Sequence, residues 1–280
     1  MREVARRLAT VGALAAGMVV VSASAASAAA TVDENYLPFK NCPVENKAVK
    51  LCLVATTTSG EFKMGSKTVK IEHPVVLQGG LTGNEGNLEL VQPTDGTSAM
   101  QAPPMKVPGG LTGVEGVGEE VTATTEPTGP IIVNVGNQSS GNGAAVILPL
   151  RVKLGNPVLG KECFIGSAAE PILLQVTTGT TSPPAPNTPI SGSKGTLTLN
   201  EEIDDLNGVS LVDNSFAAPG VNGCGESLAS VLDPVVDLSS GLPSASGHNT
   251  AILNGSVLLT TSKAVKRSHV IKKPKKAKGA

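Results

Sequence analysis

The sequence predicts an all-β protein: an antiparallel β-sandwich or barrel-like sheet with Gly/Pro-rich loops and one or two short helices. Two observations favour this class. Short runs rich in Val, Ile and Thr alternate with clusters of Gly, Pro, Asn and Ser, as strands alternate with turns. The chain also holds 32 Gly and 20 Pro but only one Tyr, four Phe and no Trp. We therefore expect a core of Val, Leu, Ile and Ala.

The predicted strands follow one another through most of the chain. The run ILLQV is almost continuously apolar, as in a central strand, whereas RVKLGNP alternates apolar and polar residues, as in a strand with one wet face. The predicted strands are Lys50–Thr57, Thr68–Ile71, Val75–Gln78, Ile131–Val135, Val146–Leu154, Ile172–Thr177, Gly195–Leu199 and Ala251–Thr261.

Helical spacing is found in one segment, Glu226–Ser240, where Leu228, Val231 and Leu232 would share a face. Pro234 interrupts this segment, so we expect two short turns of helix and no continuous rod. Asn200–Leu206 is a second helix candidate. The Pro-rich stretch TTSPPAPNTP, residues 180–189, is expected to be an extended surface connector.

An octapeptide occurs twice with one change, GGLTGNEG at 79–86 and GGLTGVEG at 109–116. Paired glycines permit positive φ, so both copies are expected to form turns at equivalent corners of the sheet. An alternative is a pair of loops that present Glu85 and Glu115 together around a cation. Two copies are fewer than the three or more that a solenoid needs.

The chain is expected to have three parts. Residues 1–30 read as a secretory signal peptide, with Arg2, Arg6 and Arg7 before a short apolar run and an A-x-A cleavage site. Residues 31–262 form the β-rich body, with a subdomain boundary considered near residue 128. Residues 263–280 form a disordered basic tail. No later apolar run is long enough for a transmembrane segment.

Charge separates the body from the tail. The net charge is −1, but residues 31–262 hold 22 acidic and 11 basic residues, whereas residues 263–280 hold eight basic residues and no acid. Such a tail is attracted to polyanions, which favours anionic cell-wall polymers as partners and no specific nucleic acid. The alternative is a solubilising or non-specific arm, or one that folds back on the acidic body. The candidate polyanion-binding residues are Lys263, Lys266, Arg267, Lys272, Lys273, Lys275, Lys276 and Lys278.

Four cysteines, Cys42, Cys52, Cys163 and Cys224, all lie in the predicted body. An even number in an exported chain indicates two disulfides. Three pairings are available, and we favour Cys42–Cys52 with Cys163–Cys224.

Several stretches resemble an uncharacterised family of secreted proteins from high-GC Gram-positive bacteria (actinobacteria). They are TTTSGEFKMGSKTVKI with VVLQGGL, NPVLGKECFIGSAAEPILLQVTTGTTSPPAPN, LVDNSFAAPGVNGCG and GLPSASGHNTAILNG. The resemblance implies a secreted or envelope-associated protein. It carries over no substrate and no catalytic residue.

No catalytic constellation is predicted. The chain lacks G-x-S-x-G, and its three histidines, His73, His248 and His269, are scattered in expected turns or in the tail. No cofactor and no firm metal site are predicted. Glu85, Glu115, Asp204 and Asp205 are metal candidates, although NEEIDDLNG does not match the ligand spacing of an EF-hand loop.

These observations favour a secreted, disulfide-stapled, non-catalytic protein of the cell envelope or exterior, whose tail is attracted to wall polymers. Scarce aromatic residues count against carbohydrate and single-stranded nucleic-acid surfaces, which stack rings. Two alternatives stay open. One is an extracellular hydrolase, and the other is a carrier that holds a small ligand inside a β-barrel. The sequence does not predict an oligomeric state.

Overall fold

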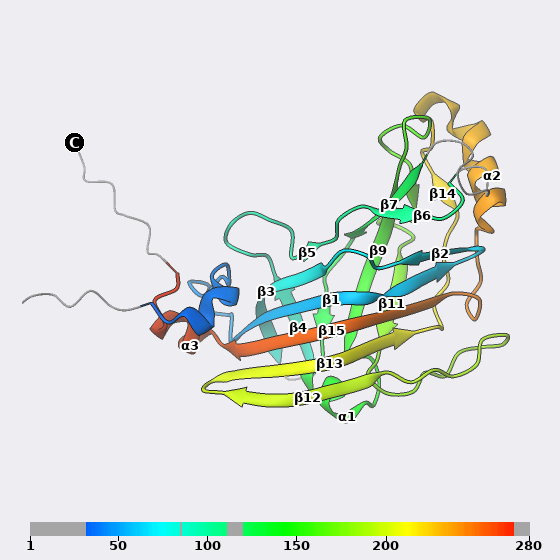
Figure 1. Cartoon of the computed structure of the whole chain (residues 1–280). Helices are drawn as coiled ribbons and strands as arrows, with labels where there is room; N and C mark the ends of the chain where they lie inside the picture. Colours follow the sequence, from blue (N-terminus) through cyan, green and yellow to red (C-terminus); the bar gives the residue numbers. More distant parts are fainter. Residues whose placement is uncertain (1–31, 85, 111–119, 272–280) are drawn as a thin grey trace, which may run out of the picture. The chain divides into compact units, whose positions relative to one another are not determined.

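Antiparallel pairing joins the strands of this protein into one sheet, seen in a computed structural model that describes residues 32–84, 86–110 and 120–271 (Figure 1). The predicted all-β antiparallel class is therefore confirmed. The strands are β1 (Leu51–Met64), β2 (Lys67–Lys70), β3 (Val75–Asn84), β4 (Asn87–Val91), β5 (Met100–Gln101), β6 (Met105–Val107), β7 (Val121–Pro127), β8 (Ile132–Val133), β9 (Val146–Gly155), β10 (Phe164–Ile165), β11 (Ile172–Val176), β12 (Ser193–Asn200), β13 (Ile203–Asp213), β14 (Val221–Asn222) and β15 (Thr250–Thr261).

The main path of the sheet runs β12-β13-β15-β1-β3-β4-β8-β9-β10-β14. Strand β1 lies between β15 and β3, with Leu51 opposite Thr261 on one side and Leu81 on the other. Strand β11 pairs with β9 beside this path. The first and last strands of the described chain, β1 and β15, therefore pair within the sheet.

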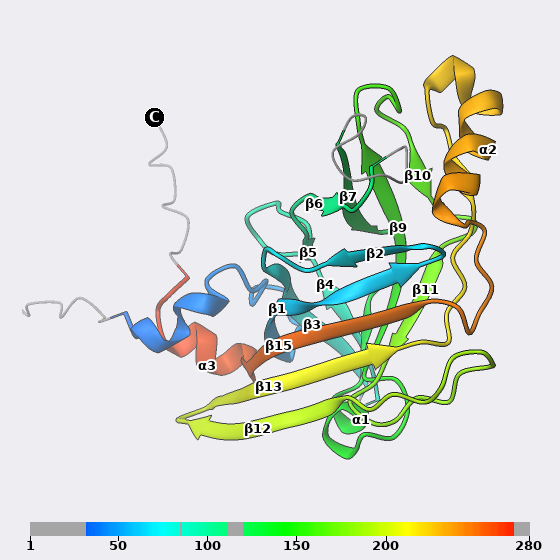
Figure 2. The ribbon, with the colours of Figure 1, turned by 45° about the vertical axis from the view of Figure 1, so that its right-hand side comes forward.

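A single bridge brings the two halves of the sheet together. Thr177 and Val212 exchange two backbone hydrogen bonds of 2.9 Å, which joins the end of β11 to β13. Strands β13, β15, β1, β3, β4, β8, β9 and β11 thus follow one another around a ring, while β12 and β14 remain at the open ends of the path. Figure 2 shows β13, β15 and β1 crossing in front of β9 and β11.

Alternating side chains supply two cores on the two faces of the sheet. Leu53 and most other buried residues belong to a large aliphatic core. The neighbouring Cys52 faces a smaller one, formed with the 3-10 helix η1 (Glu34–Phe39) and the helix α3 (Ser262–Arg267). Tyr36 and Phe39 supply its only rings among the described residues.

The predicted disordered tail is wrong at its start. Helix α3 begins at Ser262, and Ala264, Val265 and Val270 are buried in the smaller core. Basic residues are interspersed among these apolar residues. The apolar side chains pack into the smaller core, whereas Lys263, Lys266 and Arg267 are exposed to solvent. Residues 272–280 lie outside the described residues, as does the expected signal peptide.

Helix α2 (Ala229–Ser240) runs continuously through Pro234, contrary to the predicted split, and η2 (Glu226–Leu228) precedes it. A proline removes one helical hydrogen bond. The acids on either side of it compensate, because Asp233 and Asp237 fasten α2 to the backbone of residues 221–224. The remaining helix is α1 (Val135–Ser140).

The helix predicted over Asn200–Leu206 is instead a β-hairpin. Asn200 pairs with Ile203, and Glu201 turns the chain with φ 55°. Strand β13 then pairs with β12 on one side and β15 on the other. Pairing on both sides outweighs the low strand propensity of NEEIDDLNG.

The first five residues of the first octapeptide copy, GGLTG, lie within β3, so the turn predicted for them is wrong, whereas the end of the copy leads into the β3–β4 hairpin, where Asn84 pairs with Asn87. Gly79 and Gly80 lie within β3, which pairs with both β1 and β4. A Cβ atom on Gly79 (φ 154°) would lie 2.1 Å from the carbonyl oxygen of Val91, and one on Gly80 would lie 2.7 Å from Val49. The glycines permit close packing here. In the second copy Gly109 and Gly110 follow β6, and residues 111–116 lie outside the described residues.

Residue 128, near which a subdomain boundary was considered, lies between two strands of the same sheet. Strands β7 and β8 flank that residue, and both pair with β9. The described residues belong to one compact unit.

Candidate functional site

The ring of strands surrounds a cavity of about 200 Å³. Its walls are aliphatic side chains from β1, β3, β9, β13 and β15, including Leu53, Leu77, Leu148, Leu211 and Val257. Cores normally contain few voids larger than a water molecule, so this space is unusual. Phe62 is the single aromatic residue among the described lining residues.

Ser139 of α1 and Leu197 of β12 mark the mouth of the cavity, because they are the exposed residues among the described lining. Leu197 is 54% exposed, and its neighbour on the same face of β12, Leu199, is 69% exposed. Apolar side chains therefore lie at the entrance. The remaining polar lining residues are Thr57, Thr125, Gln138 and Asp204.

Helix α1 positions Gln138 against the cavity. Asn134 caps the helix by accepting a hydrogen bond from the Asn137 N–H at 2.9 Å, and Gly141 ends the helix in the left-handed conformation. The backbone N–H of Gln138 donates to Asn134, and its carbonyl accepts from the Thr178 hydroxyl at 2.9 Å. The side-chain Nε2 of Gln138 is buried and has no hydrogen-bond partner among the described residues.

A smaller hollow of about 40 Å³ shares part of the cavity wall, including Phe62, Met64 and Val69. Val236 and Leu242, from α2 and the residues just after it, close this side. The wall shared by the two spaces thus lies beneath α2, whereas the mouth lies beside α1.

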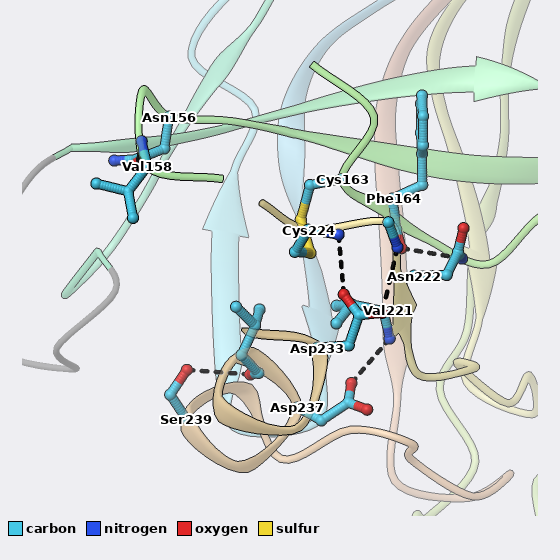
Figure 3. Close-up of a disulfide and its surroundings, with 12 residues drawn as sticks. Asn156, Val158, Cys163, Phe164, Val221, Asn222, Cys224, Asp233, Asp237 and Ser239 are labelled. Atoms are coloured by element: carbon cyan, nitrogen blue, oxygen red, sulfur yellow. Dashed lines mark hydrogen bonds between the residues drawn. A yellow bond between two sulfur atoms is a disulfide. The ribbon is translucent and has the colours of Figure 1, made fainter. Parts of the chain in front are cut away.

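Helix α2 turns its carboxylates inward (Figure 3). Asp233 accepts hydrogen bonds from the backbone N–H groups of Gly223 and Cys224 at 3.2 and 2.8 Å, and Asp237 accepts from Val221 at 2.8 Å. The Cys163–Cys224 disulfide fixes the same loop to β10. Apolar side chains occupy the outer side instead, where Leu228, Val231, Val235 and Leu238 are 56–87% exposed.

Asp213 is a buried carboxylate between β13 and β11. Its two oxygens accept backbone hydrogen bonds from Gln175 at 2.7 Å and Ser215 at 2.8 Å. Burial raises the pKa of Asp213 above its usual value, and the two hydrogen bonds oppose that shift. The side chain borders a separate polar depression of about 260 Å³ with Thr177 and Thr181. Its oxygens are already used in holding the two strands together.

Both predicted disulfides, Cys42–Cys52 and Cys163–Cys224, are confirmed. Of the four metal candidates, the structure describes Asp204 and Asp205, which lie on opposite faces of one strand. Asp204 lines the cavity, whereas its neighbour Asp205 projects from the other face of β13 and accepts from Asn207 at 2.8 Å. In the part of the chain that is described, no group of three or more His, Cys, Asp or Glu side chains could hold a metal ion. Glu85 and Glu115 lie outside the described residues.

The predicted tail residues are only partly described. Lys263, Lys266 and Arg267 are exposed on α3, and Arg267 forms an ion pair with Glu202 of the β12–β13 turn. Lys272, Lys273, Lys275, Lys276 and Lys278 lie outside the described residues. His73 and His248, which were expected in turns, are exposed, and so is His269 of the predicted tail.

Sequence reasoning proposed a ligand-bearing interior as an alternative but identified none of its residues. The sequence feature that could have indicated a cavity is the shortage of large aromatic side chains. Aliphatic side chains alone do not fill the interior of this ring of strands. No local sequence pattern identified Gln138 as a site residue, because the burial of its side-chain amide depends on how α1 packs against the strands.

None of the helices in the described ranges is long and apolar enough to cross a membrane. The chain was compared with protein-family models, curated proteins and solved structures, and none of the three comparisons produced a match.

Proposed function

We propose that this is a secreted, disulfide-stapled, non-catalytic protein of the cell envelope or exterior that holds a small apolar ligand inside its ring of strands. The observation that carries the proposal is the cavity of about 200 Å³ with aliphatic walls and a mouth beside α1. An apolar cavity of about 150 Å³ stays dry and binds benzene in another protein, so this space suits a somewhat larger apolar molecule. Small-ligand sites are concave and mostly apolar in the same way.

The cavity chemistry supports binding over catalysis. Asp204 is the one ionisable side chain among its described lining residues, and the hydroxyls of Thr57, Thr125 and Ser139 have no histidine beside them in that lining. A nucleophile needs a neighbouring base. Two disulfides support an oxidising location outside the cytoplasm.

A cavity-filling variant tests the proposal. Ala55 lines the cavity on β1, opposite Leu77 and Val257. We expect saturating butylbenzene to raise the thermal unfolding midpoint of the wild-type protein and of the surface control Ala48→Phe, but not that of Ala55→Phe. Absence of a rise with the wild type, or an undiminished rise with Ala55→Phe, would reject a ligand site in this cavity.

Attraction of the C-terminal basic segment to anionic wall polymers is a second candidate function. Lys263 and Lys266 are exposed on α3, which supports a basic surface leading into residues 272–280. Binding through such a segment weakens as salt screens the charges. We expect wall material to retain the full chain at low salt and to release it at high salt.

A further inference from the structure

We propose that the ligand of the cavity is an uncharged amphiphile, with a polar group that hydrogen-bonds Gln138 at the mouth and an apolar body that lies among the aliphatic walls. This inference rests on the proposed ligand-binding function and specifies the chemical class of the ligand. Three observations lead to it: an unpartnered donor, the charge of Asp204, and the position of α1.

The unpartnered donor is the Nε2 atom of Gln138, which is buried at a cavity whose walls are otherwise mainly aliphatic. Buried side-chain donors are nearly always hydrogen-bonded, because leaving one without a partner is unfavourable. The backbone of Gln138 is already bonded to Asn134 and Thr178, so the helix holds its side chain in place. An oxygen atom of a ligand would supply the missing acceptor.

Asp204 disfavours a negatively charged ligand. It is the one carboxylate among the described residues that line the cavity. A second negative charge inside an apolar cavity would be repelled and poorly solvated. Alcohols and other uncharged oxygen compounds are therefore favoured over carboxylates.

The position of α1 determines how the ligand is oriented in the cavity. Ser139, next to Gln138, is one of the two exposed lining residues, so the amide lies near the mouth. Met64 and Val69 lie where the cavity adjoins the hollow beneath α2. The ligand's polar group would thus remain near the entrance while its apolar body extends inward.

A matched series of phenylalkyl compounds tests this inference: butylbenzene, 4-phenyl-1-butanol and 4-phenylbutanoate. Each is titrated into the full chain, and isothermal titration calorimetry reports its affinity. We expect the alcohol to bind more tightly than the carboxylate, and Asp204→Asn to narrow that difference. Gln138→Leu should weaken the alcohol about threefold to tenfold and leave butylbenzene unchanged, as expected for one lost hydrogen bond.

Gln175→Leu is the control, because Gln175 is exposed on β11 and away from the cavity lining. Gln138→Met provides a second variant without the donor if Gln138→Leu fails to fold. Equal weakening of the alcohol and butylbenzene by either folded variant would overturn the inference, as would tight binding of the carboxylate. If none of the three compounds binds, the proposed ligand-binding function itself fails.

Discussion

Asp213 accepts a hydrogen bond of 2.7 Å from the backbone N–H of Gln175, and this contact lies beside the bridge between Thr177 and Val212. The carboxylate thus reinforces the junction that turns the strand path into a ring. Without that junction β13 would lose its connection to β11, and the cavity would lose one wall. A buried, desolvated acid at this place makes the junction sensitive to pH.

The stability of the fold should fall as pH rises through the titration of Asp213. Burial raises the pKa in the folded state above the ordinary value of 3.8, so the folded protein binds this proton more tightly than the unfolded chain does. The stabilisation is fully present below the ordinary value and is lost as pH rises through the raised folded pKa. Urea unfolding from pH 3.5 upward should show this decline in the wild type relative to Asp213→Asn.

Asp95 provides a control of opposite sign. Hydrogen bonds from the side chain and backbone of Thr97 lower the pKa of this exposed carboxylate. Its contribution is present above its ordinary pKa and is lost as pH falls through the lowered value. The difference between the wild type and Asp95→Asn should therefore change with pH in the other direction. If the difference in unfolding free energy between the wild type and Asp213→Asn did not change with pH, the raised pKa of Asp213 would be contradicted.

Adding a single methyl group at Gly79 should destabilise the sheet. Its φ of 154° disfavours other residues, and the new Cβ would collide with the carbonyl of Val91 in β4. We expect Gly79→Ala to lower the free energy of unfolding by about 1–3 kcal/mol. Gly136→Ala, on the surface of α1, should change it by less than about 1 kcal/mol. Equal effects of both substitutions, measured by urea unfolding, would contradict the close packing of β3.

In helix α2, replacing an inward-facing acidic residue should lower the free energy of unfolding more than replacing an outward-facing apolar residue. Asp233→Ala removes the acceptor for two backbone N–H groups and should cost about 2–4 kcal/mol of unfolding free energy. Leu238→Ser should cost less than about 0.5 kcal/mol, because Leu238 is 87% exposed. Thermal unfolding of the two variants compares them directly. A larger loss for Leu238→Ser would mean that the outer side of α2 is covered in solution.

Deletion of residues 263–280 should lower the free energy of unfolding more than deletion of residues 272–280. The longer deletion removes buried Ala264, Val265 and Val270 from the smaller core. Loss of several buried aliphatic side chains costs several kcal/mol. The shorter deletion is therefore the proper variant for wall binding, because reduced retention then reports lost charge in a folded protein. Unchanged retention at low salt would exclude residues 272–280 as the binding segment.

Strands whose residues have high β-propensity could be predicted from the sequence. Strands whose structure depends on pairing with neighbouring strands could not. The predicted strand Val146–Leu154 falls within β9, and Ala251–Thr261 falls within β15. Strand β13 was missed because its acids and glycine disfavour strands locally, and pairing on both sides decides its structure. The GGLTG segment was misread as a turn because its glycines serve close packing, which no local pattern reveals.

The candidate site was less predictable than the fold. Cysteine number and spacing gave the correct disulfide pairing. The cavity depends instead on the bridge between Thr177 and Val212, two residues whose proximity is a property of the whole sheet. Gln138 became a candidate only because α1 is packed where its amide loses contact with water.

The central position of β1 fixes the order of events during folding. Leu51 and Thr261 are 210 positions apart, yet they pair across the middle of the sheet. Long-range pairing of this kind is slow, because a long loop must close before the contacts form. During synthesis, which starts at the N-terminus, β1 can pair with β2 and β3 but must wait for β15 until residues 250–261 have been made. Shortened chains that end before β15 should expose the edge of β1 and the aliphatic cavity wall, and should aggregate or be degraded.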